Sequence, residues 1–355
     1  MSAFRSAAQS QRSGARTTPV LLIGNGGPGH IGGFFARALR ELGYDFRFID
    51  EAMCFAPPGR TLFRRAVDRV CLRPGEIRRF NALVASTAAS FAPAIVLVVS
   101  GRHLAPETLR RVREETGATL VAYATDNPLV PGASTTSVRR SIPEYDVYAS
   151  PRRASLDALR ARGCRLPVYV RFGYEPTVHF EEDPAEAERA AWASDVVFIG
   201  GADEDRVRFF EPLVSSGDLA IRLYGRGWAR TSLKRHAGGE VFDRQFRLAM
   251  AGTRIAPCLV RRSNRDGHVM RSFEIPACRR FLLAERTEEH LELFEEDVHA
   301  AYFVSPEELR DKTVYYLRHD SERSAMTNAA HDLVTRGCHT YRDRLIELLS
   351  HHASA

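Results

Sequence analysis

Residues 21–33 read LLIGNGGPGHIGG and place a glycine-rich turn directly behind an apolar run. The turn spells G-x-G-x-x-G from Gly24 to Gly29, and the next residues, FFARALRELG, have the apolar spacing of a helix. A second apolar run, DFRFID, ends on Asp50, about where the ribose-binding acid of a dinucleotide-binding unit stands. The stretch therefore predicts a strand, a tight turn, a helix and a second strand.

Apolar runs and amphipathic stretches keep alternating along the rest of the chain. FNALVASTAASF precedes AIVLVVS, PETLRRVREETG precedes TLVAYATDNP, and the alternation restarts with DVVFIGG at residue 195. Unbroken Val/Ile/Leu runs separated by helices indicate parallel sheets that are covered on both faces. The predicted fold class is α/β, with two tandem Rossmann-like domains facing each other across a cleft at the carboxyl ends of their strands.

Local composition sets the expected domain boundaries. The first 17 residues are rich in Ser and Arg without acids, and the segment after Tyr174 is acidic and carries two prolines. We expect a disordered tail at 1–17, a first Rossmann-like domain at 18–174, a linker at 175–193, a second Rossmann-like domain at 194–335, and a final helix and tail at 336–355.

The overall composition excludes several classes of protein. The 50 basic residues are nearly all arginine and are interspersed with 44 acidic ones, so no basic face predicts nucleic-acid binding. The longest apolar run, at 92–99, is too short to span a bilayer, which is still compatible with peripheral membrane attachment. The six cysteines have no zinc-ligand spacing, so they predict no metal site, and they read as reduced thiols of a cytoplasmic protein. We also expect no cofactor.

Residues 261–278, RRSNRDGHVMRSFEIPAC, follow a predicted strand and carry two acids eight positions apart. Asp266 is expected in the loop and Glu274 about two turns into the following helix. Carboxylates placed in this way are suited to hold sugar or ribose hydroxyls. The alternative reading is an amphipathic helix with solvated charges.

The residues between these two acids are suited to bind an anion. We expect the backbone N–H groups of Gly267, His268 and Val269 at a helix N-terminus, where they would meet a diphosphate. Arg271 adds a guanidinium in the next turn.

Here the chain resembles a known family. Residues 271–326, with HTYRDRLIELL at 339–349, are similar to the C-terminal half of the CgeB-like (spore-maturation-protein-like) glycosyltransferases, relatives of glycosyltransferase family four. The resemblance is strongest over 195–349, and TDNP at 125–128 extends it into the N-terminal half. It implies a GT-B fold and an enzyme that transfers a sugar from a nucleotide-sugar donor without a bound metal and with retention of configuration.

The resemblance also implies roles for the two acids. In the family the first acid contacts the donor sugar and the second contacts the ribose, which gives these roles to Asp266 and Glu274. The first acid is usually Glu, and Asp has a shorter reach. Arg279 and Arg280 stand where the family commonly has glycine.

Relatives carry a basic pair after the first strand of this domain, which neutralises the diphosphate. Here the first of these positions is Gly201, and only Arg206 falls near the second. Stabilisation of the leaving group is then expected from Arg206 with Arg261 or Arg271. Breaking the glycosidic bond builds negative charge on phosphate, where preorganised dipoles and arginines are most effective.

The other candidate residues follow strands or the opening glycines. Asp126 ends a predicted strand and is a candidate to orient the acceptor or act as a base, the alternative being an Asx turn before a proline. Gly225 permits close approach of the donor, or simply forms a turn. His30, Gly26 and Gly27 are candidates to contact acceptor or phosphate, although a lone histidine is more often structural.

Two other functions remain open. One is an NAD-dependent oxidoreductase that uses the Gly24–Gly29 loop, although no catalytic His, Cys or Tyr-x-x-x-Lys set accompanies it. The other is a non-catalytic relative that binds sugar nucleotides, for which Gly201 is the main argument. The expected partners of the transferase are a nucleotide sugar and a glycan, lipid, protein or small-molecule acceptor.

Overall fold

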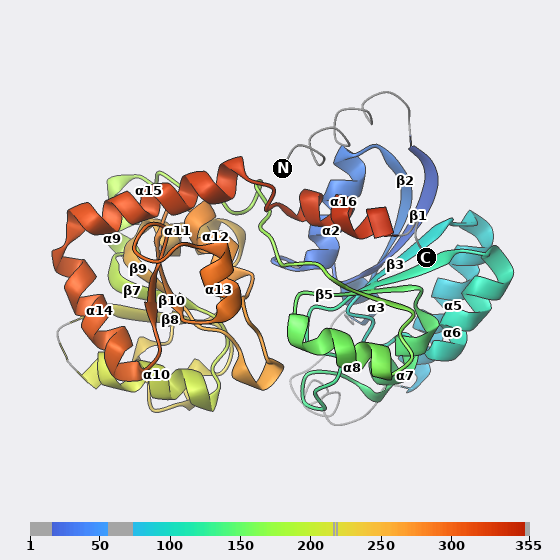
Figure 1. Cartoon of the computed structure of the whole chain (residues 1–355), viewed down its shortest axis with the longest axis horizontal. Coiled ribbons are helices and arrows are strands. Elements are labelled where there is room, and N and C mark those ends of the chain that lie inside the picture. The colour runs from blue at the N-terminus through green and yellow to red at the C-terminus, as the bar shows by residue number, and fades with distance from the viewer. Residues whose placement is uncertain (1–15, 56–73, 216, 218, 352–355) are drawn as a thin grey trace. The chain divides into compact units, whose positions relative to one another are not determined.

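The computed structural model describes residues 16–55, 74–215, 217 and 219–351. The chain divides into two compact units, which are described separately (Figure 1). The N-terminal unit contains Met1–Ser150, Ser155–Val168 and Leu345–Ala355, and the C-terminal unit contains Pro151–Ala154 and Tyr169–Arg344. Of the expected disordered tail, residues 1–15 lie outside the described residues, and Arg16 and Thr17 begin the first strand.

The N-terminal unit is built on a six-stranded sheet with the order β2-β1-β3-β4-β5-β6. Its strands are β1 (Arg16–Gly24), β2 (Tyr44–Asp50), β3 (Ile95–Val99), β4 (Thr119–Tyr123), β5 (Val147–Ser150) and β6 (Leu166–Tyr169). Its helices are α2 (Ile31–Glu41), α3 (Glu51–Phe55), α5 (Pro74–Phe91), α6 (Pro106–Thr116), α7 (Thr136–Ser141) and α8 (Leu156–Ala161). The pairings of β1 with β2 and β3, and of β4 with β3 and β5, are parallel, as the apolar runs predict.

The C-terminal unit contains a parallel five-stranded sheet with the order β11-β10-β9-β7-β8. Its strands are β7 (Ser194–Ile199), β8 (Ile221–Tyr224), β9 (Thr253–Cys258), β10 (Phe281–Glu285) and β11 (Ala301–Phe303). Its helices are α9 (Glu186–Ala191), α10 (Glu204–Ser215), α11 (Asp243–Ala251), α12 (Arg271–Ala277), α13 (Glu288–Leu293), α14 (Pro306–Arg318) and α15 (Asp320–Arg336). Helix α16 (Tyr341–Ser350) contains residues of both units.

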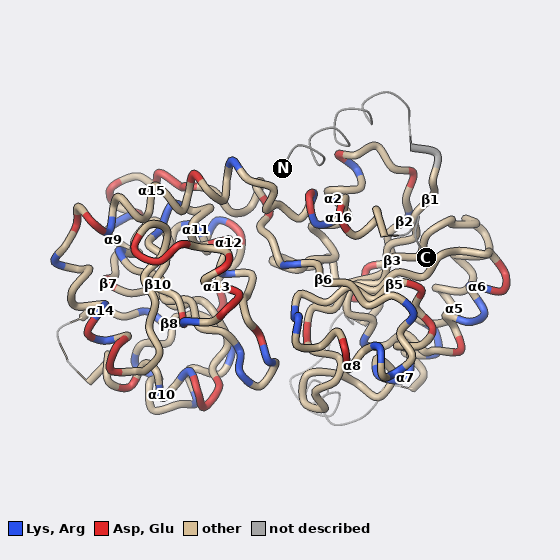
Figure 2. Tube along the Cα trace, viewed as in Figure 1, with Lys and Arg blue, Asp and Glu red and all other residues tan. Residues whose placement is uncertain are grey.

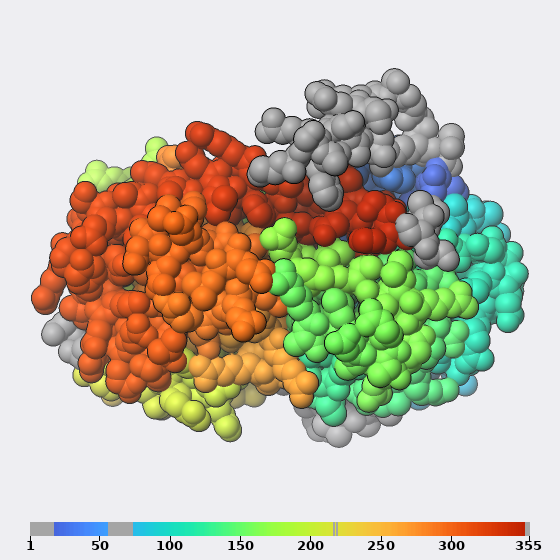
Figure 3. Space-filling model, viewed as in Figure 1, coloured from blue at the N-terminus to red at the C-terminus, as the bar shows by residue number. Residues whose placement is uncertain are grey.

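Both sheets are stabilised by apolar strands that are buried on their two faces. Every residue of β3 (IVLVV) and of β10 (FLLAE) is buried, which is the pattern of a central parallel strand between helices. Each unit has its own hydrophobic core. The core of the N-terminal unit includes Leu21 of β1, Val96 of β3 and Leu120 of β4, and that of the C-terminal unit includes Trp228 and Phe210. Helices α14 and α15 form part of the surface of the C-terminal unit in Figure 3.

Each sheet reverses its strand order at one point. In the N-terminal unit this point lies between β1 and β3, and in the C-terminal unit it lies between β7 and β9. Open α/β sheets bind their ligands outside the carboxyl ends of the strands at such a reversal. The loops that follow β7 and β9 are therefore the first place to look for a site.

Three further observations bear on the expectations from sequence. The segment 175–193 lies within the C-terminal unit and includes α9, and both Glu175 and His179 are buried. Among the described residues, no helix combines the length and the apolar character needed to cross a membrane. Basic and acidic residues are interspersed along both units in Figure 2.

Candidate functional site

The opening glycine loop of the N-terminal unit is held by Asp50. The Asp50 Oδ1 atom accepts hydrogen bonds from the backbone N–H groups of Gly26 and Ala52, both at 2.9 Å. A Cβ on Gly26 would lie 2.7 Å from Asp50 Oδ2, so this carboxylate requires glycine there. Asp50, the acid that the oxidoreductase hypothesis assigns to a ribose, therefore binds the backbone of the glycine loop.

The remaining loop candidates lie at the start of α2. The Gly27 N–H donates to Asn25 Oδ1 at 2.8 Å, and the His30 N–H donates to the Gly27 carbonyl at 3.2 Å. His30 occupies the N-cap position of α2 and is exposed. Gly27 and His30 therefore border the carboxyl end of β1, where the sequence predicts them.

Asp126 follows β4 at the carboxyl edge of the same sheet. Its carboxylate lies 3.9 Å from the Arg102 guanidinium, and both side chains line a small hollow with Ser100 and Tyr148. The Asx turn is made by the next residue, because Asn127 Oδ1 accepts the N–H of residue 129 at 3.0 Å.

Arg206 lies at the strand-order reversal of the C-terminal unit. Its side chain donates to the Gly201 carbonyl at 2.8 Å and to the Leu259 carbonyl at 3.5 Å, so it joins the ends of β7 and β9. Burial lowers the pKa of the guanidinium, and Asp203, 3.7 Å away, opposes this effect. A buried cation at this position favours an anionic ligand.

The glycines beside Arg206 differ in what they require. A Cβ on Gly225 would lie 2.3 Å from the Gly200 carbonyl oxygen, and its φ of 127° is unfavourable for other residues. A Cβ on Gly201 would meet nothing closer than the Arg226 carbonyl at 3.5 Å, with an Arg261 Nη2 atom at 3.9 Å. The backbone thus leaves room for a side chain at Gly201, and Arg261 approaches the same loop.

Asp266 is buried in an ion pair that the sequence did not predict. Its Oδ1 accepts from Arg152 Nε at 2.5 Å, and the Arg152 guanidinium lies over the ring of Phe172. Burial raises the pKa of Asp266, and Arg152 opposes the rise. Arg152 precedes Asp266 by 114 positions, and its only sequence signal was an arginine just after a predicted strand.

The expected position of Glu274 in the helix was wrong. Helix α12 begins at Arg271, so Glu274 lies in its first turn and not two turns in. The loop departs from helical geometry at Arg265, whose φ is 55°, and Ser272 Oγ accepts the Val269 N–H at 3.1 Å at the start of α12. The Val269 N–H is therefore already bonded, and Gly267 and His268 precede the helix by several residues.

Glu274 is the most deeply buried acid of the predicted set, with 1% of its surface exposed. Its Oε2 pairs with Arg271, which also donates to the Ile199 carbonyl at 3.0 Å and lies over the ring of Phe246. Burial lowers the pKa of Arg271 to about 10. Glu274 Oε1 is buried and has no hydrogen-bond partner in the described part of the chain, although His179 Nε2 lies 3.4 Å away.

The side chain of His268 is fully buried and supports the loop. Its Nε2 accepts the Phe172 N–H at 3.1 Å, and its Nδ1 donates to Glu289 Oε2 at 2.6 Å. Burial lowers its pKa, which keeps the ring neutral as this arrangement requires. The imidazole is thus engaged away from any ligand, and the sequence missed both of its partners.

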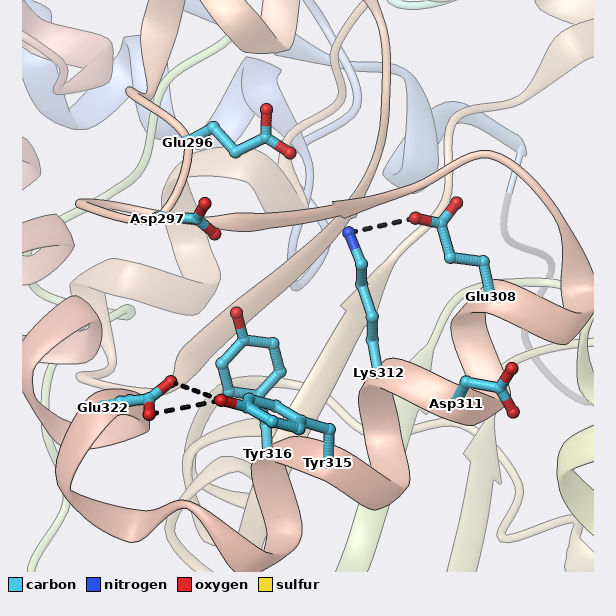
Figure 4. Close-up of a pocket in the computed structure, with 8 residues that line it drawn as sticks. All are labelled: Glu296, Asp297, Glu308, Asp311, Lys312, Tyr315, Tyr316 and Glu322. Atoms are coloured by element: carbon cyan, nitrogen blue, oxygen red, sulfur yellow. Dashed lines mark hydrogen bonds and ion pairs between the residues drawn. The ribbon is translucent and has the colours of Figure 1, made fainter.

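A separate hollow of about 750 Å³ lies beside α14 and α15 (Figure 4). Its lining is Glu296, Asp297, Glu308, Asp311, Lys312, Tyr315, Tyr316 and Glu322. Its five acids would repel a diphosphate, and none of the predicted site residues lines it. In the described parts of the chain, no three His, Cys, Asp or Glu residues are placed to hold a metal ion.

Comparison with known protein families identifies the class of enzyme. Residues 206–350 match a family described as glycosyl transferase-like, a span that includes Arg206, Asp266 and Glu274. No curated protein matches the chain. The family match establishes the predicted enzyme class, a glycosyltransferase.

Solved structures establish the fold. The Anabaena protein Alr3699/HepE in complex with UDP-glucose has a TM-score of 0.64 at 11% identity, covering 95% of this chain and 100% of that one. Sucrose-phosphate synthase from Thermosynechococcus elongatus has a TM-score of 0.68 at 10% identity, covering 95% and 98%. A putative UDP-N-acetylglucosamine 2-epimerase from Listeria monocytogenes has a TM-score of 0.56 at 13% identity, covering 95% and 96%. The predicted class of two Rossmann-like domains of GT-B type is confirmed; the cleft between them and the CgeB-like assignment stay predictions.

Proposed function

We propose that this protein transfers a sugar from a nucleotide-sugar donor bound at the carboxyl ends of β7 and β9. The observation that carries the proposal is Glu274, a buried carboxylate whose Oε2 is held by Arg271. Its Oε1 makes no hydrogen bond within the described residues, and His179 Nε2 lies 3.4 Å from it. A buried, unsatisfied acceptor is costly unless a ligand supplies a donor. The hydroxyls of a ribose are such donors, and one structural neighbour was solved with UDP-glucose.

The diphosphate is assigned to the loop after β7. Arg206 and Arg261 lie at this loop, and they contribute positive charge in a partly buried place where it acts strongly. As the donor bond breaks, negative charge grows on the phosphate, and these arginines stabilise it. We propose that they act without a metal ion, so a chelator is expected to leave turnover unchanged.

The sugar and the acceptor are assigned to the remaining predicted residues. We propose that Asp266, oriented by Arg152, accepts hydrogen bonds from sugar hydroxyls, and that Asp126 with Arg102 faces the acceptor. Retention of configuration rests on the resemblance to the CgeB-like family.

The free thiols at Cys54, Cys164, Cys258, Cys278 and Cys338 support a cytoplasmic protein.

Thermal unfolding with UDP, GDP, TDP and NAD tests the donor site. A ligand that binds only the native state at 100 times its Kd adds about 2.7 kcal/mol of stability, so one nucleoside diphosphate is expected to raise Tm clearly. Glu274→Gln removes the carboxylate charge with little change in shape, and it should weaken that nucleotide about 10- to 100-fold.

The matched control is Glu307→Gln, which alters an exposed acid of α14 in the same unit. It is expected to bind nucleotide as the wild type does. Stabilisation by NAD alone, or full nucleotide binding by a folded Glu274→Gln variant, would overturn the assignment.

A further inference from the structure

The loop that carries Asp266 rests on the segments by which the chain enters the C-terminal unit. We call residues 266–270 the donor loop and residues 151–154 and 169–172 the connector segments. The connector segments belong to the C-terminal unit but continue directly into residues of the N-terminal unit. A contact between the donor loop and a connector segment therefore links the proposed donor site to the residues where the chain passes from one unit to the other.

The first link joins Asp266 to the earlier connector segment. Arg152 donates from Nε to Asp266 Oδ1 at 2.5 Å, with 1% and 4% of the two side chains exposed. The Arg152 guanidinium lies 5.6 Å from the ring centre of Phe172, in the later connector segment. One ion pair therefore holds the loop against both segments.

The second link passes through His268. The backbone N–H of Phe172 donates to His268 Nε2, so the ring carries its proton on Nδ1 and donates it to Glu289. The ring also lies edge-on to the rings of Tyr169 and Phe172. A shift of the donor loop would break a hydrogen bond to the connector backbone.

Glu289, the second residue of α13, is where these links meet. Its Oε2 accepts from His268 Nδ1 at 2.6 Å and from the Tyr169 hydroxyl at 2.9 Å, and the carboxylate also accepts the backbone N–H of Arg153. Burial opposes its charge, but the hydrogen bonds from His268 and Tyr169 hold the pKa of Glu289 below its usual value.

The same carboxylate also lies against the donor loop backbone. A Cβ on Gly267 would lie 2.4 Å from the Glu289 carboxyl carbon, so any other residue there would displace the Glu289 side chain. The Gly267 carbonyl accepts from the Thr287 hydroxyl at 2.5 Å, which fixes the loop to the start of α13. One partly buried acid thus contacts the donor loop and both connector segments.

We propose that Glu289 is a positioning residue, which through His268 and Tyr169 clamps the donor loop to the connector segments and so couples donor binding to those segments. This inference rests on the proposed function, because it takes the donor loop as the place where the nucleotide sugar binds. A ligand that orders the loop then also restrains residues 169–172. Removing the clamp leaves the loop present but less well placed.

Hydrogen exchange with and without nucleotide tests the coupling. In the full-length wild type, the nucleoside diphosphate that raises Tm is expected to protect amides of both 266–274 and 169–174. Glu289→Gln keeps the shape of the side chain but loses its charge, and Tyr169→Phe removes one hydrogen bond. Both variants are expected to lose protection at 169–174, and Glu289→Gln to raise the donor KM about tenfold with a smaller change in kcat.

The control is Glu288→Gln, an exposed acid one position earlier on α13, and it should behave as the wild type. Protection of 266–274 without protection of 169–174 in the wild type would overturn the coupling while leaving the proposed function intact. Full coupling in a folded Glu289→Gln variant would overturn the role of Glu289. If no nucleotide protects 266–274, the proposed function fails first and the coupling falls with it.

Discussion

At the scale of single residues, the site depends most on Glu274, which is buried, and on Arg271, which is partly exposed and pairs with it. Arg271 takes one oxygen of Glu274 and a carbonyl of β7, so it is less available to a diphosphate than the sequence suggested. Arg206 is likewise tied to the Gly201 and Leu259 carbonyls. Arg261 is the third arginine of the predicted set at this place, with its Nη2 atom 3.9 Å from where a Cβ on Gly201 would lie.

The two glycines near Arg206 make a matched pair of substitutions. Gly225→Ala places a Cβ 2.3 Å from a backbone oxygen at a φ of 127°, and it is expected to cost about 2 kcal/mol or more of folding free energy. Gly201→Ala meets nothing closer than 3.5 Å and is expected to change stability by less than about 0.5 kcal/mol. Urea unfolding of both variants measures the difference; equal stabilities would show that the loop after β8 is not built as described.

Gly201 also allows a gain of function. Because a Cβ fits at this position, Gly201→Arg would add the basic residue that the resemblance to the CgeB-like family implies here, and it should lower the donor KM by several-fold, up to about tenfold. Steady-state kinetics with the cognate donor measures this effect. A folded Gly201→Arg variant with unchanged or weaker donor use would show that the missing basic residue is not what limits this enzyme.

At the scale of elements, the loop before α12 is held by a buried pair formed by Ser272 and His290. The Ser272 hydroxyl lies 2.8 Å from His290 Nε2 and accepts the Val269 N–H, while His290 Nδ1 lies 2.7 Å from the Glu285 carbonyl. With Nδ1–H donated to that carbonyl, Nε2 accepts the hydroxyl proton. The pair ties α12 to β10 and α13, so the geometry of the donor loop depends on a neutral histidine.

This pair predicts a pH dependence of stability. Burial lowers the pKa of His290 from 6.5 to about 4, so the unfolded chain takes up a proton at a higher pH than the folded one does. The stability is fully present above pH 6.5 and is lost as the pH falls towards 4, by about 3 kcal/mol for a shift of this size. Urea unfolding at pH 7 and pH 4.5 measures the loss.

The variant His290→Gln isolates this contribution. It should be less stable than the wild type at pH 7 but should lose less stability on acidification. His339, whose pKa burial also lowers to about 4, contributes in the same pH range and accounts for the part that remains. An identical pH dependence in the variant and the wild type would contradict the assignment to His290.

The elements themselves were largely predictable from sequence, because strand and helix periodicity is local. The apolar runs became β1, β3, β4 and β7, and the acids at 266 and 274 do follow β9. The start of α12 was misplaced because the loop departs from helical geometry at Arg265. Arg152, His179 and Glu289 were missed because their partners are 114, 95 and 21 positions away, where no local pattern connects them.

At the scale of the whole molecule, two sheets of similar topology carry very different loops. The opening glycine loop matches a dinucleotide fingerprint, yet Asp50 is used to hold that loop. In the C-terminal unit four charged residues lie on the loops and helices that follow β7 and β9, and two of them, Arg206 and Glu274, are buried. The other two are Asp266 and Arg271. Both units share strand-turn-helix geometry, so the proposed donor unit is distinguished from the other unit by its side chains and not by its backbone.

Release of nucleoside diphosphate from a panel of nucleotide sugars is the most direct test of the account. Wild-type protein is expected to release UDP, GDP or TDP from one donor, slowly with water and faster with an acceptor, and Glu274→Gln to do so about 100-fold more slowly. Chelation of metal ions should leave the rate unchanged. Rearrangement of a donor sugar without release of nucleotide, as an epimerase would give, or no release from any donor that the protein binds, would contradict it.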